Sequence, residues 1–235
     1  MLKEMHSNTL DWIENLEAAL GVLIDENAEL PMMARTHGQP ATPTTLGKEL
    51  NVFKQRLNKE KKTLEEQEFF AKWGGATANY NPHLLAFPQA DWLTHSEKFL
   101  DVLELKLTKV STQIEPHDYM AKVFHNLMRV NTILIDFSLD IWTYISFDYF
   151  KLKLDKNEVG SSTMPHKVNP IDFENAEGNL GLANALFNHL AEKLPRSRLQ
   201  RDLSDSTVLR NIGSAYGYME LSVSSLLKGI TKLEA

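Results

Sequence analysis

Apolar residues recur at steps of three or four positions along most of this chain. After Pro116 the recurring positions are Val123, Leu127, Val130, Leu134, Phe137, Ile141 and Ile145. Near the C-terminus they are Val208, Ile212, Tyr216, Met219, Val223, Leu226, Ile230 and Leu233. Such spacing lays one apolar stripe along a helix, and the alternation of three and four is typical of helices packed in a bundle. The pattern predicts two long helices in these regions.

Three other segments complete the predicted bundle. Segments 4–29 and 43–70 are expected to be helical, the second with Pro43 and Thr44 in its first turn. A fifth helix is predicted from about Asn169 to Lys193, and no strand alternation of useful length is visible. The helix after Pro116 would run about 30 residues, or roughly 45 Å. We expect an all-α fold, an elongated bundle of about five long helices that forms a single domain over residues 1–235.

Several of these segments carry apolar residues on more than one face. Phe147, Tyr149 and Phe150 lie beside the main stripe of their segment. These side chains would pack either inside one subunit or against other subunits. The second interpretation is favoured, and it predicts a multi-subunit helical core.

The composition excludes several classes of function. The net charge of −6 argues against a nucleic-acid-binding surface, and no apolar run is long enough to cross a membrane. The chain has no cysteine, so disulfides, thiolate metal sites and a cysteine nucleophile are excluded, and a reducing, cytoplasmic location fits. His117 and His125 lack the spacing of metal ligands, and we expect neither a metal nor a cofactor. A small anionic ligand remains compatible wherever cations gather locally.

Unusual polar residues concentrate in segments that interrupt the helical pattern. In ARTHGQPATPTTLGKE, residues 34–49, His37 lies between Thr36 and Gly38, close to two prolines that stiffen the chain. It is either a solvated loop residue or a rigidly placed acid–base group. The segment WGGATANYNPH, residues 73–83, is read as a connection between helices. In TQIEPHDY, residues 112–119, Pro116 marks a helix start, which favours a structural role for His117.

A fourth segment, GSSTMPHKVNPIDFEN, runs from residue 160 to residue 175. If a helix begins at Asn169 and Pro170, then Ser161, Ser162 and Lys167 surround its N-terminus, where free N–H groups and the helix dipole favour an anion. A serine acts as a base only where cations and dipoles favour its alkoxide, and this segment is able to supply both. The alternative is a surface loop.

Four arginines follow in an otherwise acidic chain. They lie in PRSRLQRDLSDSTVLRN and are Arg196, Arg198, Arg201 and Arg210. Ser206 and Thr207 lie between the last two, at an expected helix start. Arginine forks together with hydroxyl and N–H groups suit a phosphate or a carboxylate. The competing interpretation is a set of surface ion pairs with Asp202 and Asp205.

These motifs together resemble a known family. GSSTMPHKVNP is similar to the signature loop of the fumarase/aspartase superfamily, homotetrameric helical lyases that eliminate fumarate from succinyl-bearing substrates. His166 in this loop, RTHGQPATP and RDLSDSTVLRN resemble its adenylosuccinate lyase branch in purine biosynthesis, and VNPIDFEN and TQIEPHDY resemble the bacterial type. A fumarase or aspartase usually has a small residue at position 166, and an argininosuccinate lyase usually has Gln. The resemblance covers essentially the whole chain.

The resemblance implies a role for each matching residue. Ser161 would be the general base that takes a Cβ proton from the succinyl group, and His37 the general acid that protonates the departing nitrogen. The implied products are fumarate and AMP, and the same elimination would act on the succinylated carboxamide ribotide of de novo purine synthesis. The substrate, a small anionic nucleotide, would be bound by Thr36, Gln113, Lys167, Asn169, Asn175, Arg201, Ser206, Thr207 and Arg210.

Members of the family are much longer than this chain. The resemblance therefore implies a central helical domain without the flanking N- and C-terminal domains, with little activity by itself. It also implies a homotetramer whose sites are shared between subunits. Two alternatives stay open, another lyase of the superfamily such as an argininosuccinate lyase, and a non-catalytic structural bundle.

Overall fold

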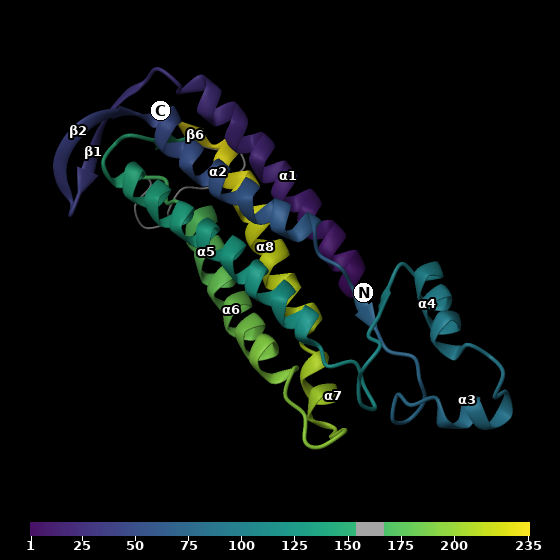
Figure 1. Ribbon diagram of the computed structural model, residues 1–235. Coiled ribbons are helices and arrows are strands. Elements are labelled where there is room, and N and C mark those ends of the chain that lie inside the picture. Colours follow the sequence, from purple (N-terminus) through teal and green to yellow (C-terminus); the bar gives the residue numbers. More distant parts are fainter. Residues whose placement is uncertain (154–166) are drawn as a thin grey trace.

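The computed structural model describes residues 1–153 and 167–235, and most of them form an elongated bundle of helices (Figure 1). The long helices are α1 (Leu2–Glu26), α2 (Leu46–Glu65), α5 (Asp118–Ser146), α6 (Ile171–Lys193) and α8 (Ile212–Thr231). They pack side by side, with α6 in contact with both α5 and α8, and with α1 against α2. The predicted all-α bundle of about five long helices is confirmed.

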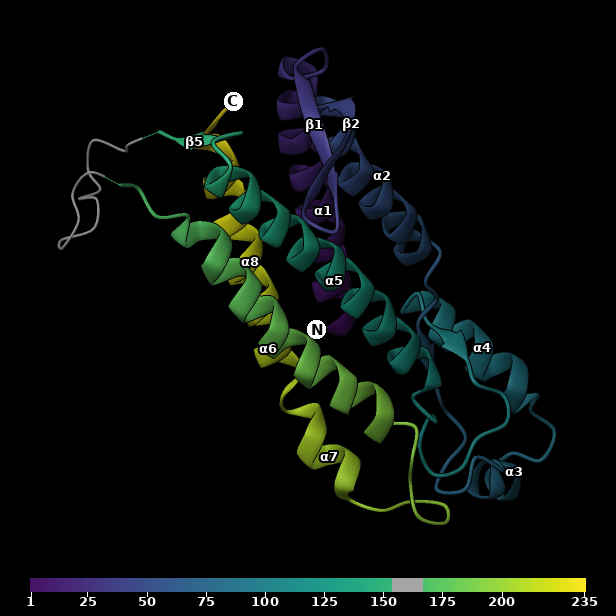
Figure 2. The same ribbon diagram turned by 90° about the vertical axis from the view of Figure 1, so that its left-hand side faces the viewer.

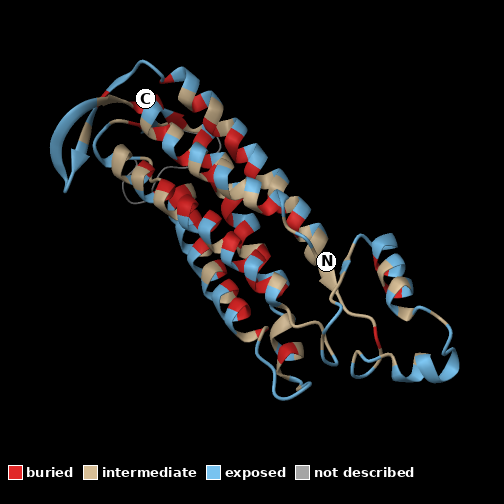
Figure 3. Ribbon diagram, viewed as in Figure 1, coloured by how far each residue is buried: buried red, intermediate tan, exposed pale blue. Residues whose placement is uncertain are grey.

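The core lies along the inner faces of the long helices (Figure 3). The predicted stripe in α5 is buried from Val123 to Ile141, and the stripe in α8 is buried from Ile212 to Ile230. Phe187 of α6 stacks on Phe124 and meets Tyr216 edge-on, so one aromatic layer joins three helices. Burial of such large apolar side chains is the main force that holds the bundle together.

The bundle has two ends, set apart by the length of α5. This helix has 29 residues, so it spans about 43 Å. The end that carries β1 (Pro31–Thr36), β2 (Gln39–Thr45) and the start of α6 is called the hairpin end. The end that carries α7 (Ser204–Leu209) and the start of α5 is called the α7 end (Figures 1 and 2). At the hairpin end β5 (Lys151–Leu152) also pairs antiparallel with β6 (Leu233–Glu234).

A smaller unit projects from the α7 end. It holds α3 (Asn81–Ala86), α4 (Trp92–Val102) and the short parallel pair of β3 (Phe70–Ala71) and β4 (Lys106–Leu107) (Figure 1). In this unit the Trp73 ring packs against His83 and Phe99, and His83 packs against Trp92, although Phe99 stays exposed. Residues 73–80 of the segment WGGATANYNPH connect α2 with α3, as expected, and its last three residues form the first part of α3. None of the helices in the described parts of the chain is both long and apolar enough to cross a membrane.

The expectation of no useful strand was wrong for residues 31–45. They form an antiparallel hairpin, and α2 begins only at Leu46, with Thr45 as the N-cap that accepts from the Lys48 N–H. Pro43 therefore belongs to a strand rather than to the first helical turn. Most residues of the hairpin are exposed, so no alternation of apolar and polar positions marks it in the sequence. His37 and Gly38 both have positive φ, at 54° and 72°, which closes a two-residue turn and brings the strands together.

Candidate active site

The predicted site residues fall into two groups at opposite ends of the bundle. Thr36 and His37 lie at the hairpin end, where α6 begins close to Lys167 and Asn169. The α7 end holds Gln113, Arg201, Ser206, Thr207 and Arg210. Ser161, the predicted base, lies outside the described residues. Because about 43 Å of helix separates the groups, one chain alone does not bring them together.

At the hairpin end, the turn that carries His37 is fastened to the end of α5. The Arg35 guanidinium lies 4.7 Å from the centroid of the Phe147 ring and donates to the carbonyl of Gly38 at 3.3 Å and to the Tyr149 hydroxyl at 3.4 Å. The Tyr149 hydroxyl in turn donates to the carbonyl of Met33 at 3.4 Å. Arg35 thus holds both the turn and its strand, a role that the sequence did not reveal because Phe147 and Tyr149 are distant in the chain.

The His37 side chain itself is exposed, and it forms no hydrogen bond with any residue that the structure describes. Thr36 beside it is also exposed. The backbone of His37 is therefore constrained while its ring is free to meet a group from outside the chain. Both ring nitrogens are therefore available to solvent or to a ligand.

A cavity of about 350 Å³ lies beneath the hairpin. Its lining includes Arg35 and Gly38 from the hairpin, Glu49 from α2 and Asp140 and Tyr144 from α5. Burial raises the pKa of Asp140, and the neighbouring carboxylates of Asp136 and Glu49 raise it further, against the opposing charge of Arg56. The surroundings of Asp140 at the hairpin end therefore disfavour its ionised form.

The start of α6 differs from the simple anion site that its sequence predicts. Pro170 is the N-cap, and the first turn contains Asp172 and Glu174, whose charges oppose the binding of an anion by the helix dipole. Asp172 accepts from the Lys232 ammonium at 2.7 Å. Lys167 is exposed and Asn169 half-buried just before the helix. An anion here would depend on these two side chains more than on the helix dipole.

Asn175, also expected to bind substrate, lies in the second turn of α6. Its side-chain amide donates to the Ser225 hydroxyl of α8 at 2.7 Å, and its side-chain oxygen accepts from Asn179 at 3.0 Å. The side chain is exposed, so a ligand would compete with these two contacts.

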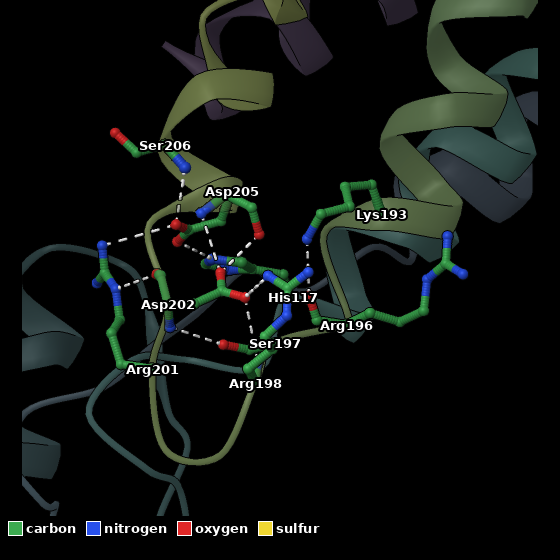
Figure 4. Close-up of polar contacts among 10 residues, drawn as sticks. His117, Lys193, Arg196, Ser197, Arg198, Arg201, Asp202, Asp205 and Ser206 are labelled. Atoms are coloured by element: carbon green, nitrogen blue, oxygen red, sulfur yellow. Dashed lines mark hydrogen bonds and ion pairs between the residues drawn. The ribbon is translucent and has the colours of Figure 1, made fainter.

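At the α7 end, the arginines and aspartates form a compact network (Figure 4). Arg198 pairs with Asp202 at 2.9 Å, and Nη2 of Arg201 lies 3.6 Å from Oδ1 of Asp205. The ion-pair interpretation is confirmed for Arg198 and Arg201, and the Arg201 side chain remains partly exposed. Arg210, at the C-cap of α7, is exposed, and its side chain makes no hydrogen bond with another described residue.

The hydroxyl groups of α7 are available at this surface. Ser206 directs its side chain away from the network in Figure 4, while its backbone N–H donates to Oδ1 of Asp205 at 2.7 Å. Thr207 is exposed. Arg201, Ser206, Thr207 and Arg210 all lie in α7 or next to it, and guanidinium and hydroxyl groups are of the kinds that bind a phosphate or carboxylate.

Gln113 lies beside this surface, on the loop that leads into α5. Its backbone carbonyl accepts from the Lys72 ammonium at 2.9 Å, and Lys72 also donates to the carbonyl of Gly75. Burial lowers the pKa of Lys72. Lys72 therefore ties the Gln113 loop to the WGG segment, and no local feature of the sequence pointed to this role. His117 is the N-cap residue of α5, but its side chain makes no capping hydrogen bond to the helix.

No three side chains of His, Cys, Asp or Glu within residues 1–153 and 167–235 are grouped so that they could hold a metal ion. The side chains described above at the two ends carry imidazole, amide, hydroxyl, ammonium, guanidinium and carboxylate groups. Such groups bind anions and transfer protons.

Comparison with known proteins relates the chain to one group of enzymes. Residues 1–184 match the family described as Lyase, and residues 197–235 match the adenylosuccinate lyase C-terminal family. Adenylosuccinate lyase of Vibrio cholerae is 52% identical over 236 residues, covering 100% of this chain and 52% of that protein. The Escherichia coli enzyme of the same name is 54% identical over 206 residues (88% of this chain, 45% of that protein), and the Dictyostelium discoideum enzyme is 58% identical over 207 (87% and 44%). The chain spans about half the length of the curated relatives that it matches.

Solved structures show the same fold. A 3-carboxy-cis,cis-muconate lactonizing enzyme from Pseudomonas putida superimposes with a TM-score of 0.83 at 21% identity, over 100% of this chain and 52% of that one. A fumarate lyase from Mesorhizobium sp. BNC1 superimposes with a TM-score of 0.78 at 16% identity, over the same fractions. At these identities the likeness concerns the fold alone.

Proposed function

The chain belongs to the lyase family and, within it, to the adenylosuccinate lyases of the fumarase/aspartase superfamily, and on this premise we propose that it forms the helical core of an enzyme that eliminates fumarate from adenylosuccinate. The second product is AMP. The same elimination acts on the succinylated carboxamide ribotide of de novo purine synthesis. The reaction uses only the protein's own side chains and takes place in the cytoplasm.

The proposed reaction has two proton transfers. Ser161 takes a proton from Cβ of the succinyl group, and the resulting carbanion is stabilised as an aci-carboxylate facing Lys167 and Asn169. The C–N bond then breaks, its electron pair stays on nitrogen, and His37 protonates that nitrogen. The observation that carries the proposal is the hairpin turn, which fixes the backbone of His37 and leaves its ring exposed at the end of the bundle where α6 begins.

We also propose that the active enzyme is a homotetramer whose sites are shared between subunits. The separation of the two residue groups by the length of α5 supports this, because the α7 end of one subunit must then meet the hairpin end of another. Large apolar side chains exposed along the bundle also support it, since subunit contacts would cover them. They include Leu139, Trp142, Leu182 and Leu221.

The first experiment measures fumarate release by the full-length reading frame that contains this chain. Adenylosuccinate is offered beside argininosuccinate, and the isolated 235-residue chain is assayed in parallel. Release from adenylosuccinate alone, with little or none from the isolated chain, is expected. Release from argininosuccinate would instead assign the enzyme to that branch, and no release from a well-folded tetramer would favour a non-catalytic bundle.

Light scattering on the same samples tests the assembly. A mass equal to four copies is expected for the full-length protein. A monomeric mass would contradict shared sites, since the two residue groups would then have no means to meet.

A further inference from the structure

Two of the candidate binding segments meet at the α7 end through one histidine. The loop before α5 carries Gln113, and the connection between α6 and α8 carries Arg201 and Ser206. Nδ1 of the His117 ring lies 3.3 Å from Oε2 of Glu115, on the loop before α5. Its Nε2 lies 3.9 Å from Oδ2 of Asp205, on α7 (Figure 4). Neither contact is a hydrogen bond, since Nδ1 is buried without a hydrogen-bond partner and 3.9 Å is too long for one, so the ring packs between the two carboxyl groups.

The three side chains of this cluster are largely removed from solvent. The exposed fraction is 7% for Asp205, 13% for Glu115 and 15% for His117. A carboxylate is rarely buried to this degree unless other groups compensate for its lost hydration. Asp205 therefore depends on the N–H, guanidinium and imidazole groups that surround it.

Several hydrogen bonds also hold the backbone of His117, from which the ring projects. His117 has a φ of 68°, in the left-handed region, which disfavours residues other than glycine. Its N–H donates to Oε2 of Glu115 at 2.7 Å, and its carbonyl accepts from the N–H groups of Met120 and Ala121. Oε1 of Glu115 accepts from the Thr108 hydroxyl at 3.3 Å. A strained conformation of this kind persists where several contacts impose it.

Asp205 in turn contacts two of the candidate binding residues, Arg201 and Ser206. Its Oδ1 accepts the Ser206 N–H at 2.7 Å and lies 3.6 Å from Nη2 of Arg201, whose Nε donates to the Asp202 carbonyl at 2.9 Å. With Nε and Nη2 engaged, the Nη1 group of Arg201 has no partner among the described residues and remains for a ligand. The Ser206 hydroxyl points away from the cluster (Figure 4).

We propose that Asp205 is a positioning residue that orients Arg201 and Ser206 toward the anionic part of the substrate, and that His117 holds Asp205 in place for this purpose. The inference rests on the proposed function, which assigns Arg201 and Ser206 to substrate binding. Neither Asp205 nor His117 touches the substrate. Their effect is on affinity for a non-reacting group, and it changes KM more than kcat.

The test uses the full-length protein and three single variants, Asp205→Asn, His117→Gln and Asp202→Asn. Asp202→Asn is the matched control, because it removes a carboxylate from the same loop that pairs with Arg198 and Ser204 rather than with the Arg201 guanidinium. The dissociation constants of AMP and of fumarate are measured by calorimetry, beside kcat and KM. Circular dichroism and light scattering verify that each variant folds and assembles.

Asp205→Asn is expected to weaken binding of one of the two products, and to raise KM, by roughly 5- to 50-fold, as for the loss of a charge-assisted contact, while kcat changes far less. Loss of AMP affinity identifies the anion as the phosphate, and loss of fumarate affinity identifies it as a carboxylate. His117→Gln is expected to weaken the same product by a smaller factor. Asp202→Asn is expected to affect neither product by as much as Asp205→Asn.

Two outcomes overturn the proposal. One is unchanged affinity for both products in Asp205→Asn, and the other is an equal loss in Asp202→Asn, which would indicate general disorder of the loop. If Asp205→Asn does not fold, His117→Gln decides alone, and unchanged affinities refute the coupling. Turnover by the wild-type protein tests the proposed function separately, because the product dissociation constants of the variants are measured without any turnover. A wild-type protein that binds neither product would overturn both.

Discussion

The two ends of the bundle each present a histidine in the same unusual backbone conformation, but in opposite surroundings. His37 and His117 have φ values of 54° and 68°. The His37 ring is exposed, whereas the His117 ring is enclosed between the carboxylates of Glu115 and Asp205. A fixed backbone therefore does not identify the role of a histidine. The surroundings of the ring are more informative, because only an imidazole with an unoccupied nitrogen is free to exchange a proton with a ligand.

The ends also differ in how complete they are within one chain. At the α7 end, polar groups are held by contacts inside the chain, and Arg201 is already oriented by Asp202 and Asp205. At the hairpin end, contacts hold the backbone through Arg35, and the predicted acid faces outward. In the proposed function, the α7 end would thus be preorganised for binding, and the hairpin end would be completed by a partner subunit or by the substrate. The following predictions test this difference.

The largest effect is expected from His37→Gln in the full-length protein. Loss of a single acid–base group should lower kcat by at least ~10²–10⁴, and Ser161→Ala is expected to cost a similar factor. Steady-state assay of fumarate release measures the loss. His189→Gln, at an exposed histidine on α6, is the control and should retain the wild-type rate. A loss below tenfold in His37→Gln would remove His37 from the acid–base role.

A smaller effect, on affinity, is expected from Arg201→Lys. A lysine ammonium does not reproduce the guanidinium fork that contacts Asp202 and Asp205 while facing a ligand, so KM should rise by roughly tenfold to a hundredfold with little change in kcat. The control is Arg198→Lys, at an exposed arginine paired with Asp202. A fall in kcat at unchanged KM would instead place Arg201 in the chemical step.

Acid is expected to weaken the α7 end through protonation of Asp202. Hydrogen bonds from the Ser204 hydroxyl and N–H, and from Arg198, lower the pKa of Asp202 to about 2. Because the folded-state pKa lies below the ordinary value, this carboxylate stabilises the fold above that value, and the contribution disappears as the pH falls toward 2. The difference in Tm between wild type and Asp202→Asn should therefore shrink between about pH 5 and pH 2. A difference that stays constant would exclude the charge of Asp202 as its cause.

The smallest effect, with the opposite sign, is expected at the hairpin end. Burial, followed by Asp136 and Glu49, raises the pKa of Asp140, so its ionised form disfavours the folded state. The stability associated with its protonated form is present in acid and is lost as the pH rises through its folded-state pKa. Asp140→Asn should raise Tm at pH 7 by about 1–2 °C and have no effect in acid. A lower Tm at pH 7 would mean that Arg56 more than compensates the charge.

Much of the bundle was predictable because the buried face of a helix shows in the spacing of apolar residues close together in the sequence. Val123 to Ile141 and Ile212 to Ile230 repeat at the period of a helix, and the same positions are buried in the structure. The hairpin was not predictable in this way, since residues 31–45 are mostly exposed and pack no regular face into the core. Val208 was placed in the last long helix by its spacing, but it belongs to α7, which ends before α8 begins at Ile212.

For the candidate site too, some features were predictable from the sequence and others were not. The sequence by itself determined which residue types are present and, through its motifs, the family and the candidates His37, Arg201 and Ser206. Only the tertiary structure decided that these candidates lie at opposite ends of α5, that Arg35 fastens the turn and that Asp205 meets His117. Residue identity and helical period are properties of neighbouring positions in the chain. Contacts between residues distant in sequence exist only once the helices have packed, because packing alone fixes their separation and their burial.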